Sequence, residues 1–140
     1  MPTSADAWAC DTSVAVAALD EAHEAHEPCR SICRRHRPAL AGHAAFETYS
    51  VLTRLPGLAR VDPEVAAAAI TGAFGDRCFL DRAQQSRLLA RLGGLGLQGG
   101  MVYDALVGEA ARLADRTLLT RDRRAIRVYD LLGVTYRFVD

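Results

Sequence analysis

Two patterns of hydrophobic positions alternate along this chain. Short apolar runs are separated by longer segments in which apolar residues recur every three or four positions. The short runs predict β-strands, and the longer segments predict α-helices. The predicted strands cover residues 7–10, 38–41, 78–80, 117–120 and 134–139. The predicted helices cover residues 14–19, a segment around residues 29–35, and residues 44–55, 63–70, 82–92, 101–114 and 123–132.

Capping and turn residues mark the ends of several elements. Asp62 and Pro63 form a helix start, with Asp as the N-cap and Pro at the first helical position. Five glycines in residues 93–100 predict a loop. The helical spacing places Leu88, Leu89 and Leu92 inward in one helix and gathers Phe46, Val51 and Leu55 near one side of another.

The order of the elements predicts an α/β fold. Strands that alternate with helices are typical of a parallel sheet with helices on both faces. Ligands of such sheets bind beyond the carboxyl ends of the strands, near a switch in strand order. Acidic residues that follow a strand, or that open the next helix, are therefore the first candidates for chemistry.

Composition narrows the class of protein. A chain of 140 residues has the size of one domain, residues 1–140, and its seventeen basic and seventeen acidic residues cancel. This balance excludes a polybasic or acidic tail. Every basic residue is Arg, so the chain lacks the lysine of a P-loop, of Schiff-base chemistry and of a Ser–Lys pair. The arginine side chains could still bind an anionic ligand such as a phosphate.

Cysteine usage and hydropathy predict a cytoplasmic location. Four cysteines without a CxxC spacing indicate reduced thiols. No apolar stretch approaches the roughly 20 residues of a membrane span. Residues 1–11 lack the charge pattern of a signal peptide.

Four carboxylates occupy the positions that the fold prediction singles out. Asp11 and Asp122 follow the first and fourth predicted strands, while Glu47 and Asp104 lie in or near the first turns of helices. Carboxylates that converge repel each other unless a cation neutralises them, and Mg²⁺ or Mn²⁺ prefers such oxygen ligands. Any one of these acids is also compatible with a helix cap or a solvated residue, which is how we interpret Asp62 and Asp81.

The context of these acids resembles a known family. The segments in question are residues 9–14 (ACDTSV), 46–55 (FETYSVLTRL), 103–107 (YDALV) and 118–125 (LLTRDRRA). In this order they resemble the PIN-domain nucleases and, within that family, the VapC toxins of bacterial type II toxin–antitoxin modules. The resemblance extends over nearly the whole chain.

The resemblance implies a three-layer α/β/α sandwich with a central parallel sheet of about five short strands. It also implies an endoribonuclease in which Asp11, Glu47, Asp104 and Asp122 bind one or two Mg²⁺ or Mn²⁺ ions. The implied partners are RNA, a cognate VapB-like antitoxin and a second copy of the chain. From their positions, we expect the hydroxyls of Thr12, Ser13 and Thr120 to orient carboxylates or bound water.

Two other functions compete with this interpretation. A phosphotransferase with Asp11 as nucleophile would want an acid two residues later and a lysine, but position 13 is Ser and the chain has no Lys. The alternative from a different class is a non-catalytic PIN-like module that binds RNA or protein. Retention of all four acids argues against it.

The sequence leaves the roles of three further groups of residues undecided. Residues His23, His26, Cys29, Cys33 and His36 have spacings that could align Zn²⁺ ligands, but Pro28 interrupts or starts their helix, and a buried Cys pair beside partly exposed His is the commoner outcome. Two arginine-rich clusters could contact RNA, or an antitoxin, or simply be solvated. The clusters are Arg30, Arg34, Arg35, His36 and Arg37, and Arg112, Arg116, Arg121, Arg123, Arg124 and Arg127.

Overall fold

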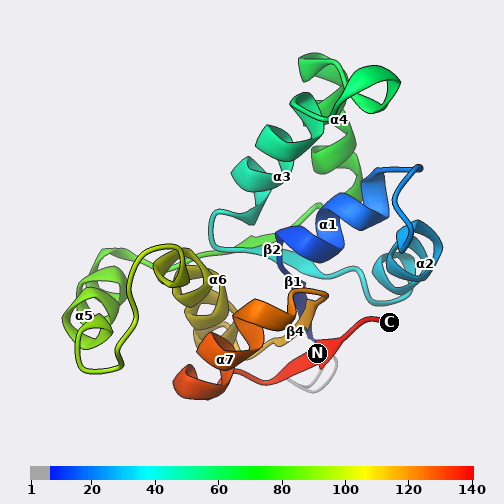
Figure 1. The fold of residues 1–140 in the computed structure, drawn as a ribbon. Coiled ribbons are helices and arrows are strands. Elements are labelled where there is room, and N and C mark those ends of the chain that lie inside the picture. Colours follow the sequence, from blue (N-terminus) through cyan, green and yellow to red (C-terminus); the bar gives the residue numbers. More distant parts are fainter. Residues whose placement is uncertain (1–6) are drawn as a thin grey trace.

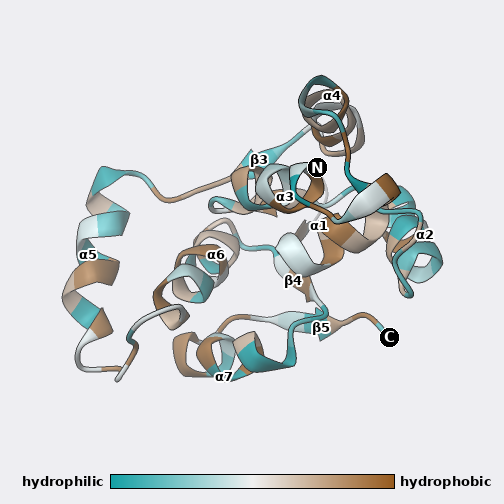
Figure 2. Cartoon of the chain, turned by 45° about the horizontal axis from the view of Figure 1, so that its top comes forward, coloured by the Kyte–Doolittle hydropathy of each residue, from teal (hydrophilic) through white to brown (hydrophobic). Residues whose placement is uncertain are grey.

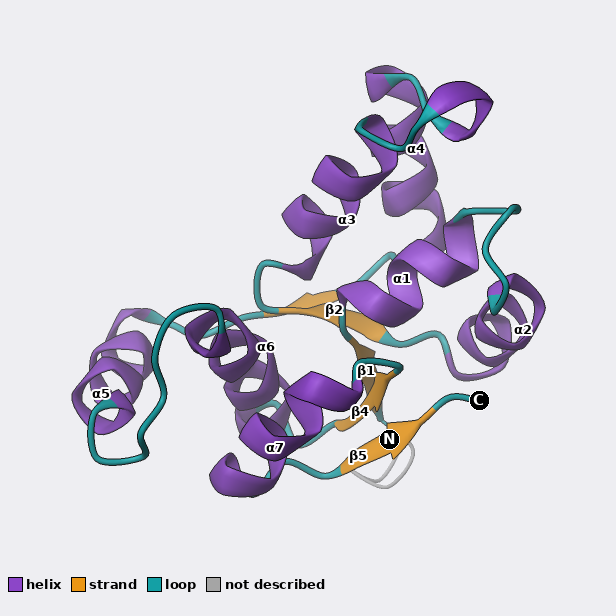
Figure 3. Ribbon diagram, viewed as in Figure 1, coloured by secondary structure: helices purple, strands orange, loops and turns teal. Residues whose placement is uncertain are grey.

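The fold is built on a five-stranded parallel sheet. It is seen in a computed structural model that describes residues 7–140 (Figures 1 and 3). The strands are β1 (Trp8–Cys10), β2 (Ala39–Ala41), β3 (Arg77–Cys78), β4 (Thr117–Thr120) and β5 (Tyr136–Phe138), in the spatial order β3-β2-β1-β4-β5. Every neighbouring pair runs parallel. The predicted sheet of about five short strands is confirmed, although the third strand ends before Phe79 and the fifth begins only at Tyr136.

Helices cover both faces of the sheet, which confirms the three-layer α/β/α sandwich. One face carries α1 (Thr12–Leu19), α2 (His26–His36), α3 (Ala44–Thr53) and α4 (Pro63–Ala73), with a short 3-10 helix, η2 (Gly57–Ala59), between the last two. The other face carries α5 (Arg82–Leu92), α6 (Met101–Leu113) and α7 (Arg123–Leu132).

Successive strand residues feed two separate cores because side chains alternate across a sheet. Cys10, Leu40 and Leu119 belong to the core under α1–α4. Ala9, Ala41 and Leu118 belong to the core under α5–α7. The strands are buried on both faces, which explains why they appear in the sequence as continuous apolar runs.

Two predictions about helix faces are wrong in part. Leu88 is buried and Leu92 packs against the second core, as predicted, but Leu89 is 72% exposed on α5, which stands apart from the body of the molecule (Figures 1 and 2). Phe46 is also 72% exposed, because α3 buries its Ala44, Ala45, Thr48 and Leu52 side. Leu55 does pack against the first core.

A buried acid links α5 to α6. Glu109 is only 4% exposed. It accepts hydrogen bonds from Arg112 Nε at 2.6 Å and from Arg91 Nη1 at 3.2 Å. Because Arg91 lies on α5, this pairing holds the otherwise loosely packed helix against the body.

The sheet order creates a switch point between β1 and β4. From β1 the chain proceeds outward to β2 and β3 and then returns to place β4 on the other side of β1. Connections diverge at this point, which leaves a crevice at the carboxyl ends of the two strands. Asp11 follows β1 and Asp122 follows β4 by two residues, so both acids lie at this edge.

Two predictions concern the cellular location of the protein: the lack of a membrane-spanning helix and the lack of a signal peptide. Among the described residues, no helix combines the length and the apolarity needed to cross a bilayer. The prediction that the N-terminus lacks a signal peptide depends in part on residues 1–6, which lie outside the described part of the chain.

Candidate active site

Asp11 is the buried centre of the site. It is 5% exposed and caps α1, the helix that follows β1. Its Oδ1 accepts hydrogen bonds from Ser13 Oγ at 2.5 Å and from the amide of Val14 at 3.3 Å. Its Oδ2 accepts from Thr120 Oγ1 at 2.5 Å and from the Tyr129 hydroxyl at 3.0 Å. Burial raises the pKa of Asp11, and these hydrogen bonds to its ionised form oppose the rise.

Two of these hydroxyls join Asp11 to the loop after β4. Ser13 Oγ donates to Asp11 and accepts from the amide of Arg121 at 2.8 Å. Thr120 Oγ1 donates to Asp11 and accepts from the amide of Asp122 at 3.0 Å. The hydroxyls therefore fix the β1 carboxylate relative to the β4–α7 turn. This confirms the expectation that Ser13 and Thr120 orient carboxylates.

Glu47 enters the site from the first turn of α3. Its Oε2 accepts a hydrogen bond from Thr12 Oγ1 at 2.9 Å, as expected for a hydroxyl that orients a carboxylate. Its Oε1 pairs with Nε2 of His43, four residues earlier. The His43 ring in turn packs edge-on against Tyr103, with ring centroids 5.5 Å apart. Glu47 is thus held from two helices, α1 and α3.

Asp104 is a carboxylate whose pKa is raised by burial and by the other three acids. It lies in the first turn of α6, and its pKa is raised to about 6. The largest cause is burial, followed by the negative charges of Asp122, Asp11 and Glu47. The structure therefore brings the four predicted acids near enough together for three of them to disfavour ionisation of the fourth.

Asp122 borders the open side of the site. It caps α7, and its Oδ1 accepts hydrogen bonds from the amides of Arg124 at 3.0 Å and Ala125 at 3.4 Å. A shallow cavity of about 490 Å³ lies between Asp122 and Glu47, and Thr12 and Ser13 also line it. A second cavity of about 580 Å³ on the other side of Asp122 is lined by Arg121, Arg123 and Arg124.

The four acids are neighbours, but they are not gathered around one point. Within residues 7–140, no three His, Cys, Asp or Glu side chains are arranged closely enough to hold a metal ion. The carboxylates influence one another through space, by the repulsion between their negative charges. Metal binding by Asp11, Glu47, Asp104 and Asp122 therefore stays a prediction.

Two residues of the site were missed from the sequence. Tyr129 reaches Asp11 from α7, and only its place on the inner face of that helix could have suggested this. His43 precedes Glu47 by four residues, a spacing that joins side chains on one side of a helix. Tyr129 follows no predicted strand, whereas His43 does follow one but is not acidic, and the search at the strand ends was for acidic residues.

The predicted alternative for the His/Cys series is confirmed in part, because the histidines are partly exposed and Cys29 is buried, but Cys33 is only half-buried. Pro28 lies within the first turn of α2, so four of the five residues share that helix, but they point to different partners. Cys29 is buried, while the His36 ring stacks on Trp8 with centroids 4.3 Å apart. His26 Nδ1 hydrogen bonds with the carbonyl of Ala17 at 2.9 Å.

Comparison with known proteins identifies the family. The PIN domain matches residues 9–131 of the chain. Ribonuclease VapC27 of Mycobacterium tuberculosis (strain ATCC 25618 / H37Rv) is 42% identical over 126 residues, which cover 90% of this chain and 92% of that protein. Ribonuclease VapC40 of Mycobacterium tuberculosis (strain CDC 1551 / Oshkosh) is 41% identical over 130 residues, covering 92% and 96%. This chain therefore belongs to the PIN-domain family and, within it, to the VapC proteins.

Proposed function

We propose that this chain is a divalent-metal-dependent endoribonuclease and the toxin of a VapBC-type toxin–antitoxin pair. The observation that carries the proposal is the placement of four carboxylates at the β1–β4 switch point, where burial and then the charges of the other three acids raise the pKa of Asp104. Two relatives that share about two-fifths of its residues carry the name ribonuclease, which supports RNA as the substrate.

The donor set fits a hard divalent cation. Carboxylate oxygens are the ligands that Mg²⁺ and Mn²⁺ prefer, and Asp11, Glu47, Asp104 and Asp122 supply them. A bound cation would offset the repulsion between these four carboxylates. Each oxygen of Asp11 already accepts two hydrogen bonds, so we expect a cation to take the place of a hydroxyl donor that can rotate away.

The chain's own residues then account for the rest of the chemistry. When bound, the metal supplies a water nucleophile at neutral pH and neutralises charge that develops on the phosphate. Of Ser13, Thr120 and Tyr129, the hydroxyls that a cation does not displace would hold Asp11 in one orientation, which limits the reorganisation needed during the reaction. Thr12 and His43 do the same for Glu47.

Arginines beside Asp122 supply an RNA-binding surface. Arg123 and Arg124 are exposed, and the Arg123 guanidinium lies 4.2 Å from the centroid of the Phe138 ring. Arg121 is fixed by donation from its Nη1 to the carbonyl of Val139 at 2.6 Å. We propose that these three residues bind the RNA backbone next to the acids, and that a VapB-like antitoxin covers the same surface in the inactive complex.

Exposed apolar residues near α5 support a homodimer. Phe79 is 71% exposed and Leu89 is 72% exposed, and both lie on or next to a helix that stands apart from the body (Figure 1). Exposed apolar side chains on a projecting helix favour a protein partner. We propose that this partner is a second copy of the chain and that the pair acts on cytoplasmic RNA.

Incubation with RNA tests the proposed activity. Purified protein without antitoxin is mixed with total bacterial RNA, with and without Mg²⁺ or Mn²⁺, beside Asp11→Asn and the exposed control variant Glu64→Gln on α4. We expect discrete fragments that require metal, persist in Glu64→Gln and vanish in Asp11→Asn. Intact RNA in every lane, together with retained RNA binding, would support the non-catalytic module instead.

A further inference from the structure

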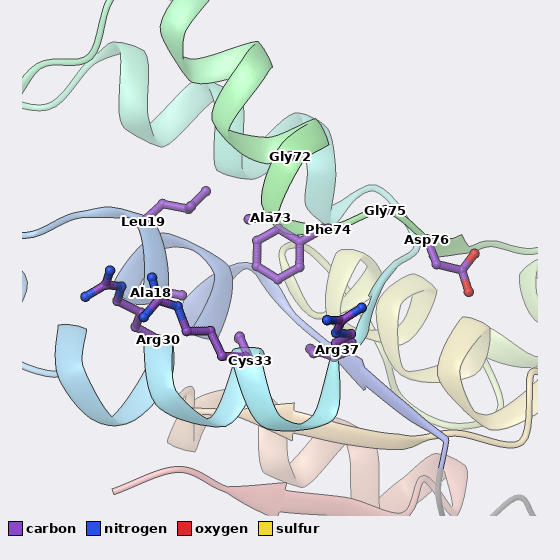
Figure 4. A pocket seen from close by; sticks show the side chains of 12 residues that line it. Ala18, Leu19, Arg30, Cys33, Arg37, Gly72, Ala73, Phe74, Gly75 and Asp76 are labelled. Carbon is purple, nitrogen blue, oxygen red and sulfur yellow. The ribbon is translucent and has the colours of Figure 1, made fainter. Parts of the chain in front are cut away.

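A cavity on the α1–α4 face lies away from the acidic site. It has a volume of about 950 Å³ (Figure 4). Helix α1 separates the two places, because its first residue, Thr12, lines the acidic site and its last residues, Ala18 and Leu19, line this cavity. Phe74, which follows α4, contributes an aromatic wall.

The cavity is cationic. Arg30, Arg34 and Arg37 of α2 and its C-cap line it. The acidic lining residue, Asp76, is already engaged, since its Oδ2 accepts from Arg116 at 2.9 Å and its Oδ1 from a backbone amide. Among residues 7–140, Arg34 and Arg37 form no salt bridge. Unbalanced guanidinium groups in a hollow of this size attract small anions.

A thiol opens into the same cavity. Cys33 lines it from α2 and is half-buried (Figure 4). Its side chain also packs against the adjoining core, which contains the fully buried Cys10, the last residue of β1. The pair thus consists of one half-buried thiol that opens into the cavity and one thiol that is closed off from solvent. The function proposed above does not use either of them.

We propose that Cys33 and Cys10 form a thiol–disulfide exchange site whose reagent is a small anionic disulfide bound in the arginine-lined cavity. The Cys33 thiolate attacks one sulfur of the reagent, forms a mixed disulfide and releases one thiolate of the reagent. The Cys10 thiol then attacks Cys33 Sγ, which forms the Cys10–Cys33 bond and releases the second half of the reagent as a thiol that takes up the Cys10 proton. Two protein thiols are oxidised and one reagent disulfide is reduced.

The bond would connect the active-site strand to α2. Cys10 directly precedes Asp11, so a covalent link to α2 would restrict the carboxylate at the centre of the site. The exchange chemistry itself does not depend on nuclease activity. It can therefore be tested by mass and by thiol content alone.

Oxidised glutathione is the probe for the test. The folded full chain is treated with it, quenched with an alkylating agent and mapped by peptide mass spectrometry, beside Cys10→Ser, Cys33→Ser and the control variant Cys78→Ser, which removes another half-buried thiol. We expect a Cys10–Cys33 bridge in the unmodified chain and in Cys78→Ser. We expect a trapped glutathione adduct on Cys33 in Cys10→Ser, and neither product in Cys33→Ser.

A second comparison tests the role of the arginine charges in the cavity. We expect Arg34→Gln with Arg37→Gln to slow the reaction with oxidised glutathione roughly tenfold. The same double variant should react at an unchanged rate with the neutral bis(2-hydroxyethyl) disulfide. Circular dichroism confirms that each variant is folded. Modification of Cys78 in preference to Cys33, a glutathione adduct that Cys10 never displaces, or equal slowing with both reagents would overturn the proposal.

Discussion

The hydroxyl of Tyr129 donates a hydrogen bond to Oδ2 of Asp11 at 3.0 Å, from a residue 118 positions later in the chain. Tyr129 reaches this carboxylate from α7 because α6 leaves space for its ring. A Cβ atom at Gly108 of α6 would lie 2.8 Å from Cδ1 of Tyr129 and 3.1 Å from Cγ2 of Val134. The small residue on one helix therefore sets the position of a hydrogen-bond donor on another.

Gly108→Ala should disturb the site without touching an acid. We expect the displaced Tyr129 ring to lower the free energy of unfolding by about 1–3 kcal/mol, as overpacking does, and to reduce RNA cleavage. Urea unfolding and cleavage rates measure both effects. The matched control is Gly72→Ala in α4, where a Cβ meets no atom within 4 Å, so stability should be kept or slightly raised. Equal behaviour of the two variants would contradict the role given to Gly108.

Tyr129→Phe isolates the hydrogen bond from the packing. We expect a loss of about 1 kcal/mol in the free energy of unfolding. Because the hydroxyl stabilises ionised Asp11, its removal should raise the pKa of that carboxyl further. Metal-dependent cleavage should then begin at a higher pH than in the unmodified chain. A pH–rate profile that does not move would show that Tyr129 serves packing alone.

Asp104 makes stability depend on pH. Its pKa of about 6 exceeds the value of 3.8 for an ordinary Asp, so the folded state favours the protonated form. Its contribution to stability is therefore present below about pH 4 and is lost as the pH rises through about 6. We expect Asp104→Asn to be more stable by about 1–2 kcal/mol near pH 7, after allowance for solvent screening, and equally stable near pH 4. Melting temperatures of both proteins from pH 4 to 8 test this, and a pH-independent difference would refute it.

Glu109→Gln should loosen α5. The change leaves Arg91 and Arg112 without their shared carboxylate, and we expect a loss of about 2–4 kcal/mol in the free energy of unfolding. Arg91→Gln should cost less, because the Arg91 side chain is 46% exposed. Hydrogen exchange should increase first in α5. Uniform exchange throughout the molecule would show that the ion pair does not anchor this helix in particular.

Much of the fold was predictable from the sequence because the helix and strand signals in short segments agree with the pattern of buried residues in the structure. The α6 and α7 starts, the Asp62–Pro63 cap and the apolar strand runs each depend on a few neighbouring residues. The inward prediction for Leu89 was wrong because α5 projects from the body and buries only its Leu88 side, so Leu89 faces outward. Periodicity shows that a helix has an apolar face, but not how much of that face is covered.

The acids of the site were predictable for a similar reason. Parallel strands bring their carboxyl ends to one edge, so Asp11 and Asp122 had to be near each other once the strand order had its switch there. The contact of Tyr129 with Asp11 and that of His43 with Tyr103 depend instead on how α7, α6 and α3 pack, and no short segment of sequence records that packing.

The most direct test of the central claim is a Mn²⁺ titration of the purified chain near pH 7.5, followed by electron paramagnetic resonance. The acids Asp11, Glu47, Asp104 and Asp122 are changed one at a time to their amides, and Glu64→Gln is the control. We predict saturable binding by the unmodified chain and by Glu64→Gln, and an affinity at least roughly tenfold lower in each of the four variants. Binding that is absent from the unmodified chain, or that survives unchanged in the four variants, would contradict the assignment of this site as a metal centre.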